Sequence, residues 1–184
     1  MTVKTLYYDD LDIKEMVSNI LMHMHRDNWK PDYIVGITRG GLIPAVYMSH
    51  YLDVRMETLK VALHENQECE TNCWMAEDAF GYTTRKDQTE TVYYGNPDSR
   101  KNILIVDDIN NSGDTLNWIV NNWQSSCMPF AQEIWDDIWG NSVRFAVLHD
   151  TWSSQFKHKI NYAAKEITNI DGDVCIKYPW ERNK

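Results

Sequence analysis

Two adjacent carboxylates follow the most continuously apolar segment of the chain. Asp107 and Asp108 come directly after the run Lys101–Val106, and a turn with the sequence Asn-Asn-Ser-Gly-Asp-Thr, residues 110–115, leads from them into a pattern with helical spacing. The glycine of that turn, Gly113, permits a close approach of the backbone, and the start of a helix directs free N–H groups at an anion. The turn is therefore a candidate site for one phosphate monoester, to which the Ser and Thr hydroxyl groups also contribute.

The two acids narrow the kind of phosphate that this turn can hold. Carboxylates beside a phosphate repel it, unless the same ligand also offers hydroxyl groups or brings a cation. A ribose 5-phosphate meets this condition, because its diol can reach Asp107 and Asp108 while its phosphate lies in the turn 110–115. The nucleoside-triphosphate P-loop is excluded, because the turn lacks the Gly-x-x-x-x-Gly-Lys-Ser/Thr pattern. The alternative interpretation is a strand end with solvated carboxylates before an ordinary helix N-cap.

Periodic patterns predict the elements that position this turn. Apolar residues spaced by three and four within residues 11–24 predict an amphipathic helix with acidic residues at its positive end. The β-branched run Tyr33–Thr38 predicts a strand, which a glycine turn at residues 39–41 connects to a helix over Leu42–Tyr51. The alternating stretch Val54–Leu63 predicts a second strand.

The rest of the chain continues the alternation of strands and helices. The polar stretch His64–Arg100 is predicted to be a flexible loop with a small hairpin around Thr91–Tyr94. The elements predicted after it are, in chain order, the strand Lys101–Val106, the helix Thr115–Trp123, a loop-like stretch Ser125–Asn141, the strand Ser142–His149 and short strands within Tyr162–Trp180. This order predicts an α/β fold with a mostly parallel twisted sheet flanked by helices, whose ligands bind beyond the carboxyl ends of the strands.

Composition favours one soluble domain. A chain of 184 residues with 43% apolar residues can close one core, so we expect a single domain over residues 1–184, with a core at about 30–150 and a tail at about 151–184. The formal charge is −9 and the basic residues are dispersed, which argues against polymeric nucleic acid as a partner. No apolar run approaches the roughly 20 residues of a membrane span, and no export signal opens the chain, so we expect a cytoplasmic protein without membrane attachment.

The four cysteines are expected to be free thiols, because they are too few to form a disulfide framework. Cys69 and Cys73, with His64 upstream, form at most a partial metal site, since no second pair stands at zinc-like spacing. The eight Trp and ten Tyr residues are expected to serve core packing and subunit contacts.

The segment Ile103–Thr115 resembles the signature of the type I phosphoribosyltransferases, which is a hydrophobic strand, two acidic residues and a Thr/Ser-Gly-x-Thr turn. This resemblance implies that the acidic pair contacts the ribose hydroxyls and that the turn binds the 5-phosphate. It also implies a fold with a flexible loop and a small C-terminal hood. The turn residues that it assigns to the phosphate are Asn110, Asn111, Ser112, Gly113, Asp114 and Thr115.

A second segment, Ile34–Ala45, resembles the pyrophosphate loop of this family and is most similar to its xanthine-guanine branch. The resemblance makes Arg39, Gly40 and Gly41 the candidate pyrophosphate contacts. A guanidinium can pair with two phosphate oxygens, and glycines let main-chain N–H groups come close. The tail Val174–Trp180 is similar to the Trp-Ile-x-x-Pro-Trp ending of xanthine-guanine enzymes.

The resemblance implies an enzyme of purine salvage, a glycosyltransferase (pentosyltransferase) that moves the 5-phosphoribosyl group from 5-phosphoribosyl-1-pyrophosphate to a nucleobase, most simply a purine, with release of pyrophosphate. The implied cofactor is Mg²⁺, held near Asp107 and Asp108 directly, through water or through the ligand. The implied catalytic residues are Asp107, Asp108, Asn111 and Arg39. The family also implies a homo-oligomer, a dimer or tetramer, and a lid within residues 64–100 whose cationic candidates are Arg85, Lys86 and Arg100.

The sequence departs from the purine-salvage pattern at the base. Asn111 stands where similar members often carry Asp, and an amide cannot accept the proton of the purine ring nitrogen. The lysine that contacts the purine 6-oxo group is missing, because the chain continues with residues 149–151, His-Asp-Thr. Cys175 takes the place of the stacking tryptophan, which leaves the base to Ile176 and Tyr178, or to Trp180. Two alternatives therefore stay open, a regulator that binds phosphoribosyl pyrophosphate without turnover, and a flavodoxin-like binding module without ribosyl chemistry.

Overall fold

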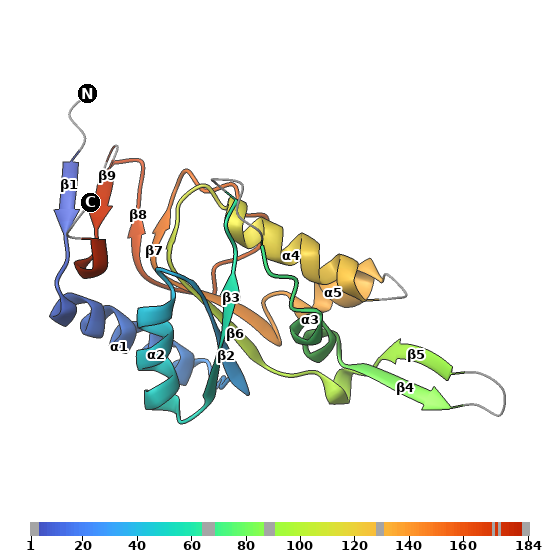
Figure 1. Cartoon of the computed structure of the whole chain (residues 1–184). Helices are drawn as coiled ribbons and strands as arrows, with labels where there is room; N and C mark the ends of the chain where they lie inside the picture. Colours follow the sequence, from blue (N-terminus) through green and yellow to red (C-terminus); the bar gives the residue numbers. More distant parts are fainter. Residues whose placement is uncertain are drawn as a thin grey trace.

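A five-stranded sheet forms the centre of the chain, and all its strands are parallel (Figure 1). The computed structural model describes residues 4–63, 69–86, 91–127, 131–170, 172 and 174–181, with the backbone alone at 84–86 and 91–93. The strand order is β3-β2-β6-β7-β8, and the strands are β2 (Tyr33–Thr38), β3 (Arg55–Lys60), β6 (Ile103–Asn110), β7 (Val143–Thr151) and β8 (Tyr162–Ile167). The prediction of a mostly parallel sheet flanked by helices is confirmed.

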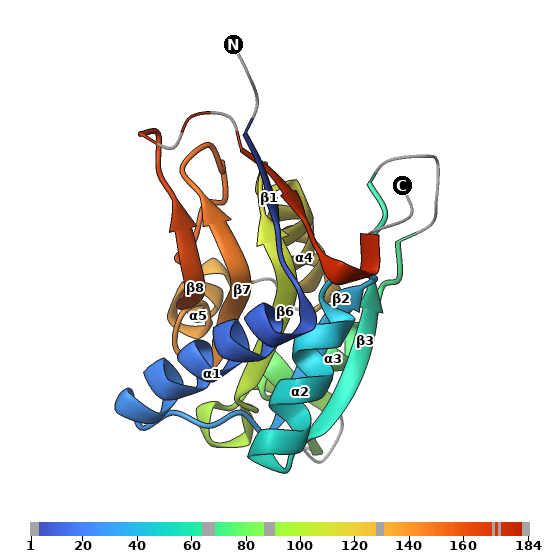
Figure 2. The same ribbon diagram turned by 90° about the vertical axis from the view of Figure 1, so that its left-hand side faces the viewer.

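Helices cover both faces of this sheet. Figure 2 shows α1 (Asp10–Arg26) and α2 (Leu42–Leu52) in front of the strands, with α3 (Cys73–Phe80), α4 (Asp114–Ser126) and α5 (Gln132–Ile138) behind them. The first pair packs on Ile34, Leu104 and Val106, whereas the second group packs on Val35, Ile103 and Ile105. Neighbouring residues of one strand point to opposite faces, which is why the continuous apolar runs are buried on both sides.

The expected amphipathic helix is α1, and its start follows from its sequence. The Asp9 carboxylate accepts hydrogen bonds from the N–H groups of Leu11 and Asp12, and the Asp12 carboxylate accepts one from the N–H group of Asp9. This reciprocal capping box satisfies backbone donors that a helix start leaves free. The buried stripe begins at Ile13, since Leu11 is 74% exposed.

Two short helices occupy stretches that were expected to be loops, and those expectations were wrong. α3 buries Phe80 and α5 buries Trp135, whose rings lie 5.5 Å apart between centroids. Helices of two turns have little stability of their own, so packing of large rings against the sheet decides their formation, not a long periodic pattern. The expected hairpin is confirmed as β4 (Tyr82–Lys86) and β5 (Thr91–Gly95), which extend away from the sheet in Figure 1.

A second, two-stranded sheet brings the two ends of the described chain together. β1 (Lys4–Tyr7) pairs in parallel with β9 (Val174–Lys177), and a short 3-10 helix (Pro179–Glu181) follows β9. The strand β1 was not predicted, because three of its four residues are exposed and they carry no clear alternation. The expectation of strands near the C-terminus is confirmed by β8 and β9.

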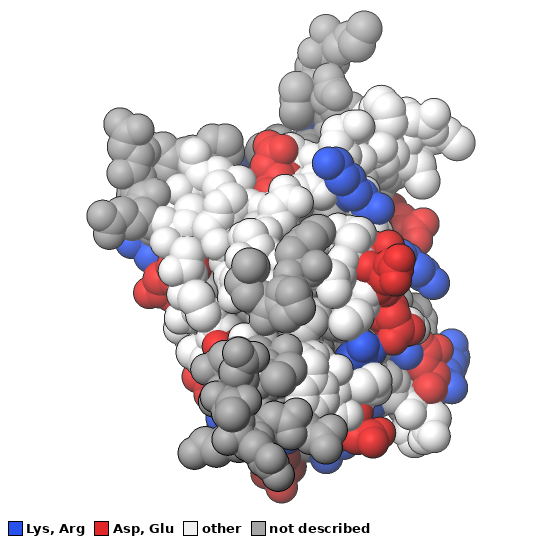
Figure 3. Space-filling model, turned by 90° about the vertical axis from the view of Figure 1, so that its right-hand side faces the viewer, with Lys and Arg blue, Asp and Glu red and all other residues white. Residues whose placement is uncertain are grey.

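Charged residues are dispersed over the surface. On the face shown in Figure 3, Lys and Arg side chains stand among Asp and Glu side chains and do not gather into a basic patch. Within the described residues, no helix is long and apolar enough to span a membrane.

Candidate functional site

The two acids lie at the carboxyl end of β6, in the centre of the sheet. β6 continues past Val106 to Asn110, because its register with β7 is kept through the pair Asn110 and Asp150. Asp107 and Asp108 are both partly buried, and Oδ1 of Asp107 accepts a hydrogen bond of 2.9 Å from the N–H group of Asp108. The acids therefore belong to the strand itself and are held firmly.

Their environment disfavours negative charge. Burial raises the pKa of Asp107 well above its ordinary value, and the charge of Asp108 adds to this effect. Burial also raises the pKa of Asp108, which hydrogen bonds from the Ile109 N–H group and the Trp180 side chain partly counter. A ligand that brings hydroxyl donors or a cation would stabilise both carboxylates, so the pair is suited to a sugar diol or to Mg²⁺.

The glycine turn after β2 touches the acidic pair. A Cβ atom at Gly40 would overlap the carboxylate of Asp108, and a Cβ atom at Gly41 would overlap the carbonyl oxygen of Val106. Only glycine allows this contact, which joins two motifs that lie far apart in the sequence. Arg39 is exposed beside them, the peptide bond before it is cis, and no salt bridge within the described part of the chain involves it.

The turn after β6 is a supported helix entrance. Gly113 has φ 86° and precedes α4, and any Cβ atom there would overlap the backbone of Phe156. The Gln155 N–H group donates to the carbonyl oxygen of Ser112 over 2.9 Å, so the chain after β7 supports the turn from behind. Asn111, Ser112 and Asp114 are exposed, whereas Thr115 is half-buried in the first turn of α4.

The side chains within the turn are not all free for a ligand. Ser112 Oγ accepts from the Asp114 N–H group over 3.3 Å and donates to the Asp114 carboxylate over 2.8 Å. That carboxylate lies at the start of α4, where a phosphate would also be favoured. A phosphate in this turn would therefore depend on main-chain N–H groups and on movement of the Asp114 side chain.

Asn110 points toward the neighbouring strand. It is 3% exposed, and its Nδ2 atom donates a hydrogen bond of 2.8 Å to Oδ1 of Asp150 on β7. Its own Oδ1 atom is buried without a hydrogen-bond partner. Thr151 Oγ1 lies within hydrogen-bond distance of the carbonyl oxygens of Asn110 and Asn111, at 3.1 and 3.0 Å. Sequence reasoning missed Asp150 and Thr151 as neighbours of the turn, because only the strand register brings them there.

The tail is fastened to the acidic pair through Tyr178. This residue is 2% exposed, and its hydroxyl group donates to the carbonyl oxygen of Asp108 over 2.9 Å. Nδ1 of His149 lies 2.8 Å from the same hydroxyl oxygen and must be the donor, because the single hydroxyl proton is already used. Burial and the nearby charge of Lys165 lower the pKa of His149 to about 4, so this ring is neutral at pH 7.

The two residues that were expected to contact the base, Ile176 and Tyr178, do not form an open surface on which a base could stack. Tyr178 has almost no exposed area, and the half-buried Trp180 stacks on it with ring centroids 4.8 Å apart. Ile176 is half-buried on β9, opposite Leu6 of β1. In this arrangement the ring of Tyr178 offers no free face to a base.

Arg85, Lys86 and Arg100 were the cationic residues expected in the lid, and the structure describes the side chain of Arg100 only. Arg100 forms an ion pair of 2.6 Å with Asp137 on α5, and the Arg100 side chain is 12% exposed. The side chains of Arg85 and Lys86 lie outside the described residues, as does His64. Cys69 and Cys73 are free thiols, and no group of three or more potential metal ligands occurs in the described ranges.

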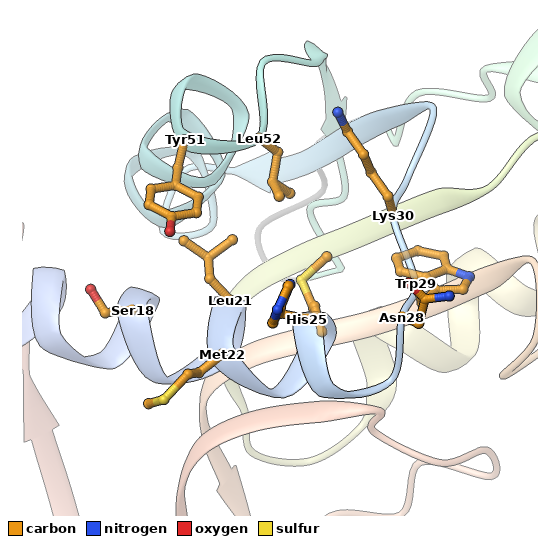
Figure 4. A pocket seen from close by; sticks show the side chains of 10 residues that line it. Ser18, Leu21, Met22, His25, Asn28, Trp29, Lys30, Tyr51 and Leu52 are labelled. Carbon is orange, nitrogen blue, oxygen red and sulfur yellow. The ribbon is translucent and has the colours of Figure 1, made fainter.

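Two cavities differ in their relation to this site. One of about 490 Å³ is lined by residues near the ends of α1 and α2 and just before β2 (Figure 4). The acids lie at the carboxyl end of β6, which is parallel to β2, so this cavity is at the opposite end of the strands. Leu21 and Leu52 form its apolar part, and His25 and Lys30 its polar part. Another cavity, of about 330 Å³, includes Asp150 and Thr151 and thus adjoins the turn after β6.

Comparisons with known proteins agree with this geometry. The family model described as "Phosphoribosyl transferase domain" matches residues 7–177. A xanthine-guanine phosphoribosyltransferase of Cereibacter sphaeroides is 36% identical over 91 residues, which are 49% of this chain and 46% of that protein, so the match spans less than half the length of this relative.

Solved structures match over nearly the whole chain. A purine phosphoribosyltransferase of Pyrococcus horikoshii has a TM-score of 0.59 at 19% identity, covering 98% of this chain and 96% of that one. The xanthine-guanine-hypoxanthine phosphoribosyltransferase of Helicobacter pylori has a TM-score of 0.60 at 19% identity, with coverages of 97% and 95%. At such low identity these matches concern the fold, and they support the expected type I fold.

Proposed function

Since this chain belongs to the phosphoribosyl transferase family, a family of transferases, we propose that it transfers the 5-phosphoribosyl group of 5-phosphoribosyl-1-pyrophosphate to a nucleobase of the purine class and releases pyrophosphate. The observation that carries this proposal is the contact between Gly40 and the Asp108 carboxylate. This contact brings three segments together at the carboxyl ends of β2 and β6. They are the acidic pair, the turn after β6 (residues 110–115) and the glycine turn after β2 (residues 39–41), called the Arg39 loop below.

The acidic pair and the turn hold the two ends of the ribose phosphate. The carboxylates of Asp107 and Asp108 accept hydrogen bonds from the 2- and 3-hydroxyl groups. The turn 110–115 binds the 5-phosphate through main-chain N–H groups at the start of α4. This grip immobilises the sugar, and positioning of this kind supplies much of the rate enhancement in reactions that need little covalent help.

The pyrophosphate lies at the Arg39 loop. The exposed guanidinium of Arg39 pairs with phosphate oxygens, while Gly40 and Gly41 let main-chain N–H groups approach. The acidic pair fits Mg²⁺, because magnesium is commonly bound by one or two carboxylates together with substrate phosphates. Asp107 and Asp108 would hold the ion, which would supply positive charge against the departing pyrophosphate.

The reaction exchanges one bond at C1 of the ribose for another. A ring nitrogen of the base donates its electron pair to C1 as the bond from C1 to the pyrophosphate oxygen breaks, and those electrons leave with pyrophosphate. The Asn111 amide can hydrogen-bond to the ring nitrogen of the base but cannot accept its proton. That proton therefore passes to solvent. Fixed donors around the pyrophosphate favour the transition state over the bound substrate.

A thermal-shift measurement followed by a base panel tests this function. Mg²⁺ and phosphoribosyl pyrophosphate together should raise the melting temperature, since a ligand that binds only the folded state stabilises it. The protein is then incubated with guanine, xanthine, hypoxanthine, adenine, uracil and orotate, and pyrophosphate release is measured. Release with at least one purine supports the proposal, whereas binding without release from any base contradicts turnover.

A second candidate function is a regulator that binds phosphoribosyl pyrophosphate without turnover. Asn111 favours it, because an amide takes the place of a possible proton acceptor. A melting-temperature rise with no pyrophosphate release from any base would establish this reading over the enzymatic one.

We also propose that the chain forms a homo-oligomer through the outer sides of α1 and α2. Large apolar side chains are exposed there, namely Leu11, Met22, Ile43, Val46, Tyr47 and Tyr51. Exposed apolar patches of this kind commonly mark subunit contacts. Sedimentation should give a dimer or tetramer, and a monomer at working concentration would contradict the proposal.

A further inference from the structure

The cavity at the ends of α1 and α2 is separate from the proposed phosphoribosyl site. It has a volume of about 490 Å³ and is lined by residues of both helices and of the turn before β2 (Figure 4). The acidic pair lies at the other end of the parallel strands. Ligand sites in proteins are commonly cavities of this size, with an apolar lining and a few polar groups.

The wall of this cavity is largely apolar. Leu21 and Met24 line it from α1, where they are 8% and 1% exposed, and Leu52 lines it from the last position of α2. Figure 4 shows the side chain of Tyr51 directed from α2 toward Leu21 on α1. A ligand in this place would bury apolar surface, which is a main source of affinity in such cavities.

Trp29 adds an aromatic surface that is held in place. The guanidinium carbon of Arg144 lies 4.7 Å from the centre of its ring, and the ring of Tyr162 lies 6.3 Å away between centroids. Its backbone is also fixed, because the Trp29 N–H group donates to the carbonyl oxygen of Met24 over 3.2 Å. An aromatic side chain that is already ordered loses little conformational entropy when a flat ring packs against it.

The polar groups of the lining are basic or neutral. Lys30 and His25 are the bases, and the neutral groups are Ser18, Asn28 and the hydroxyl group of Tyr51. None of the described residues that line the cavity is Asp or Glu, although the chain carries a formal charge of −9. Within the described ranges, no salt bridge involves Lys30 or His25. The exposed ammonium group of Lys30 can therefore pair with an anion.

We propose that this cavity is a second ligand site and that its ligand is a small aromatic molecule with one anionic group, a carboxylate, sulfonate or phosphate. The aromatic ring lies against Trp29 and the apolar wall, and the anionic group pairs with Lys30. His25 and Asn28 donate hydrogen bonds to the same group. The inference goes beyond the proposed transfer reaction and does not depend on it, because no lining residue belongs to the phosphoribosyl site.

A fluorescent probe with this chemistry is anilinonaphthalene sulfonate, which joins aromatic rings to one sulfonate and reports on apolar surroundings. Phenylnaphthylamine, the same ring system without the sulfonate, is its neutral counterpart. Titration of the full chain should show a saturable site for the sulfonate, and saturating Mg²⁺ and phosphoribosyl pyrophosphate should not compete with it. Competition would place the probe in the phosphoribosyl site and overturn the inference, as would the lack of a saturable site.

Lys30→Gln tests the charge of the ligand. The variant should bind the sulfonate about two- to fivefold more weakly, the range for the loss of an exposed ion pair, while its affinity for phenylnaphthylamine stays unchanged. Lys159→Gln, which changes another exposed lysine, is the matched control and should bind both probes as the wild type does. Equal effects of Lys30→Gln on the two probes, or no effect on either, would overturn the assignment of an anionic ligand.

Ser18→Trp tests the location. The indole would occupy the cavity, so both probes should bind at least about tenfold more weakly, because most of the buried contact area is lost. Ser18→Ala leaves the cavity open and should bind both probes as the wild type does. Ser18 is exposed and Trp resembles Ser in helix propensity, so the fold should persist, which an unchanged melting temperature checks. Unchanged binding in Ser18→Trp would contradict the location.

A second copy of the chain is the competing occupant of the cavity. Met22 and Tyr51 line the cavity and also belong to the apolar surface proposed above for subunit contacts. If a partner subunit fills the cavity, probe binding per chain should fall as the protein concentration rises through the range in which sedimentation shows association. That result would overturn the inference, whereas binding that does not change with protein concentration supports it.

Discussion

The two sides of β6 differ in the kind of groups that they offer to a ligand. The side toward β2 offers mainly backbone groups, and the side toward β7 offers mainly side chains. On the phosphoribosyl flank, contacts depend on backbone and glycine, since Gly40, Gly41 and Gly113 each stand where a Cβ atom would overlap a neighbouring group. On the flank toward β7 and β8, side chains at the strand ends, among them Asp150, Trp152 and Glu166, line a cavity. Backbone contacts suit a part of the ligand that never changes, while side chains can vary with the base at little cost to the fold.

The acids of the two flanks also differ in how they are brought together. Asp107 and Asp108 are adjacent in one strand, so their proximity is visible in the sequence. Asp150 and Glu166 meet only through the pairing of β7 with β8. Burial is the main cause of the raised pKa of Asp107, Asp108 and Asp150, and a neighbouring negative charge contributes at each of the three. Each pair therefore favours a ligand that donates hydrogen bonds or carries positive charge.

The largest effect is expected from Asp108→Asn on the phosphoribosyl flank. The variant should lose most of the melting-temperature rise with Mg²⁺ and phosphoribosyl pyrophosphate, and kcat/KM should fall about 10²–10³-fold, as when one preorganised electrostatic contact is removed. Thermal shift and pyrophosphate release measure the two effects. Glu15→Gln, which changes an exposed carboxylate on α1, is the matched control and should behave as the wild type. An unchanged thermal shift in Asp108→Asn would show that the acids do not hold the ribose.

Gly113→Ala tests the backbone character of the same flank. The residue has φ 86° and its Cβ atom would overlap the backbone of Phe156, so the variant should lose about 1–3 kcal/mol of unfolding free energy. Urea denaturation measures this loss. Gly172→Ala is the control, because Gly172 has φ 71° but nothing within 4 Å of its Cβ position, so it should lose less. Equal losses in both variants would mean that close packing against Phe156 is unimportant.

Sequence reasoning identified the residues on the β2 side of β6 but not those on the β7 side, for a physical reason. β2 and the first four residues of β6 are continuous β-branched or apolar runs. The glycines and acids that come directly after these runs can therefore be found without knowledge of the tertiary fold. The neighbours Asn110 and Asp150 depend on register, which no local pattern encodes. The helix α5 was missed because Trp135 and Ile138 are its only buried residues in seven. A usable signal was present, since residues 150–152 directly follow the predicted strand Ser142–His149 and so stand where ligands bind in a parallel sheet.

Tyr178→Phe distinguishes two roles of Tyr178, a hydrogen bond that stabilises the fold and a contact with the base. Loss of the hydroxyl group leaves the carbonyl oxygen of Asp108 and Nδ1 of His149 without their partner, which should cost about 1–2 kcal/mol of unfolding free energy. The KM for the base should stay within about twofold of the wild type, because a change below roughly 0.4 kcal/mol corresponds to that factor. Tyr7→Phe, at a residue that is 76% exposed, is the control for stability. A large rise in KM without loss of stability would return Tyr178 to the base site.

The smallest effect concerns the charge that the acidic pair carries without a ligand. Because burial raises the folded-state pKa of Asp107 above its unfolded value, the folded protein binds this proton more tightly, and stability falls as the pH rises between those two values. Asp107→Asn removes the penalty while its amide oxygen can still accept from the Asp108 N–H group. The ligand-free variant should therefore melt roughly 2–4 °C above the wild type at pH 7, the shift that about 1 kcal/mol produces at this chain length. The difference should shrink as the pH is lowered toward the ordinary carboxyl range, in melting curves recorded for both proteins across that interval.

The same variant should bind phosphoribosyl pyrophosphate more weakly, since the charge that destabilises the empty site is the charge that the diol and Mg²⁺ require. A variant that is no more stable than the wild type at pH 7 would show that this carboxylate is solvated well enough to ionise freely.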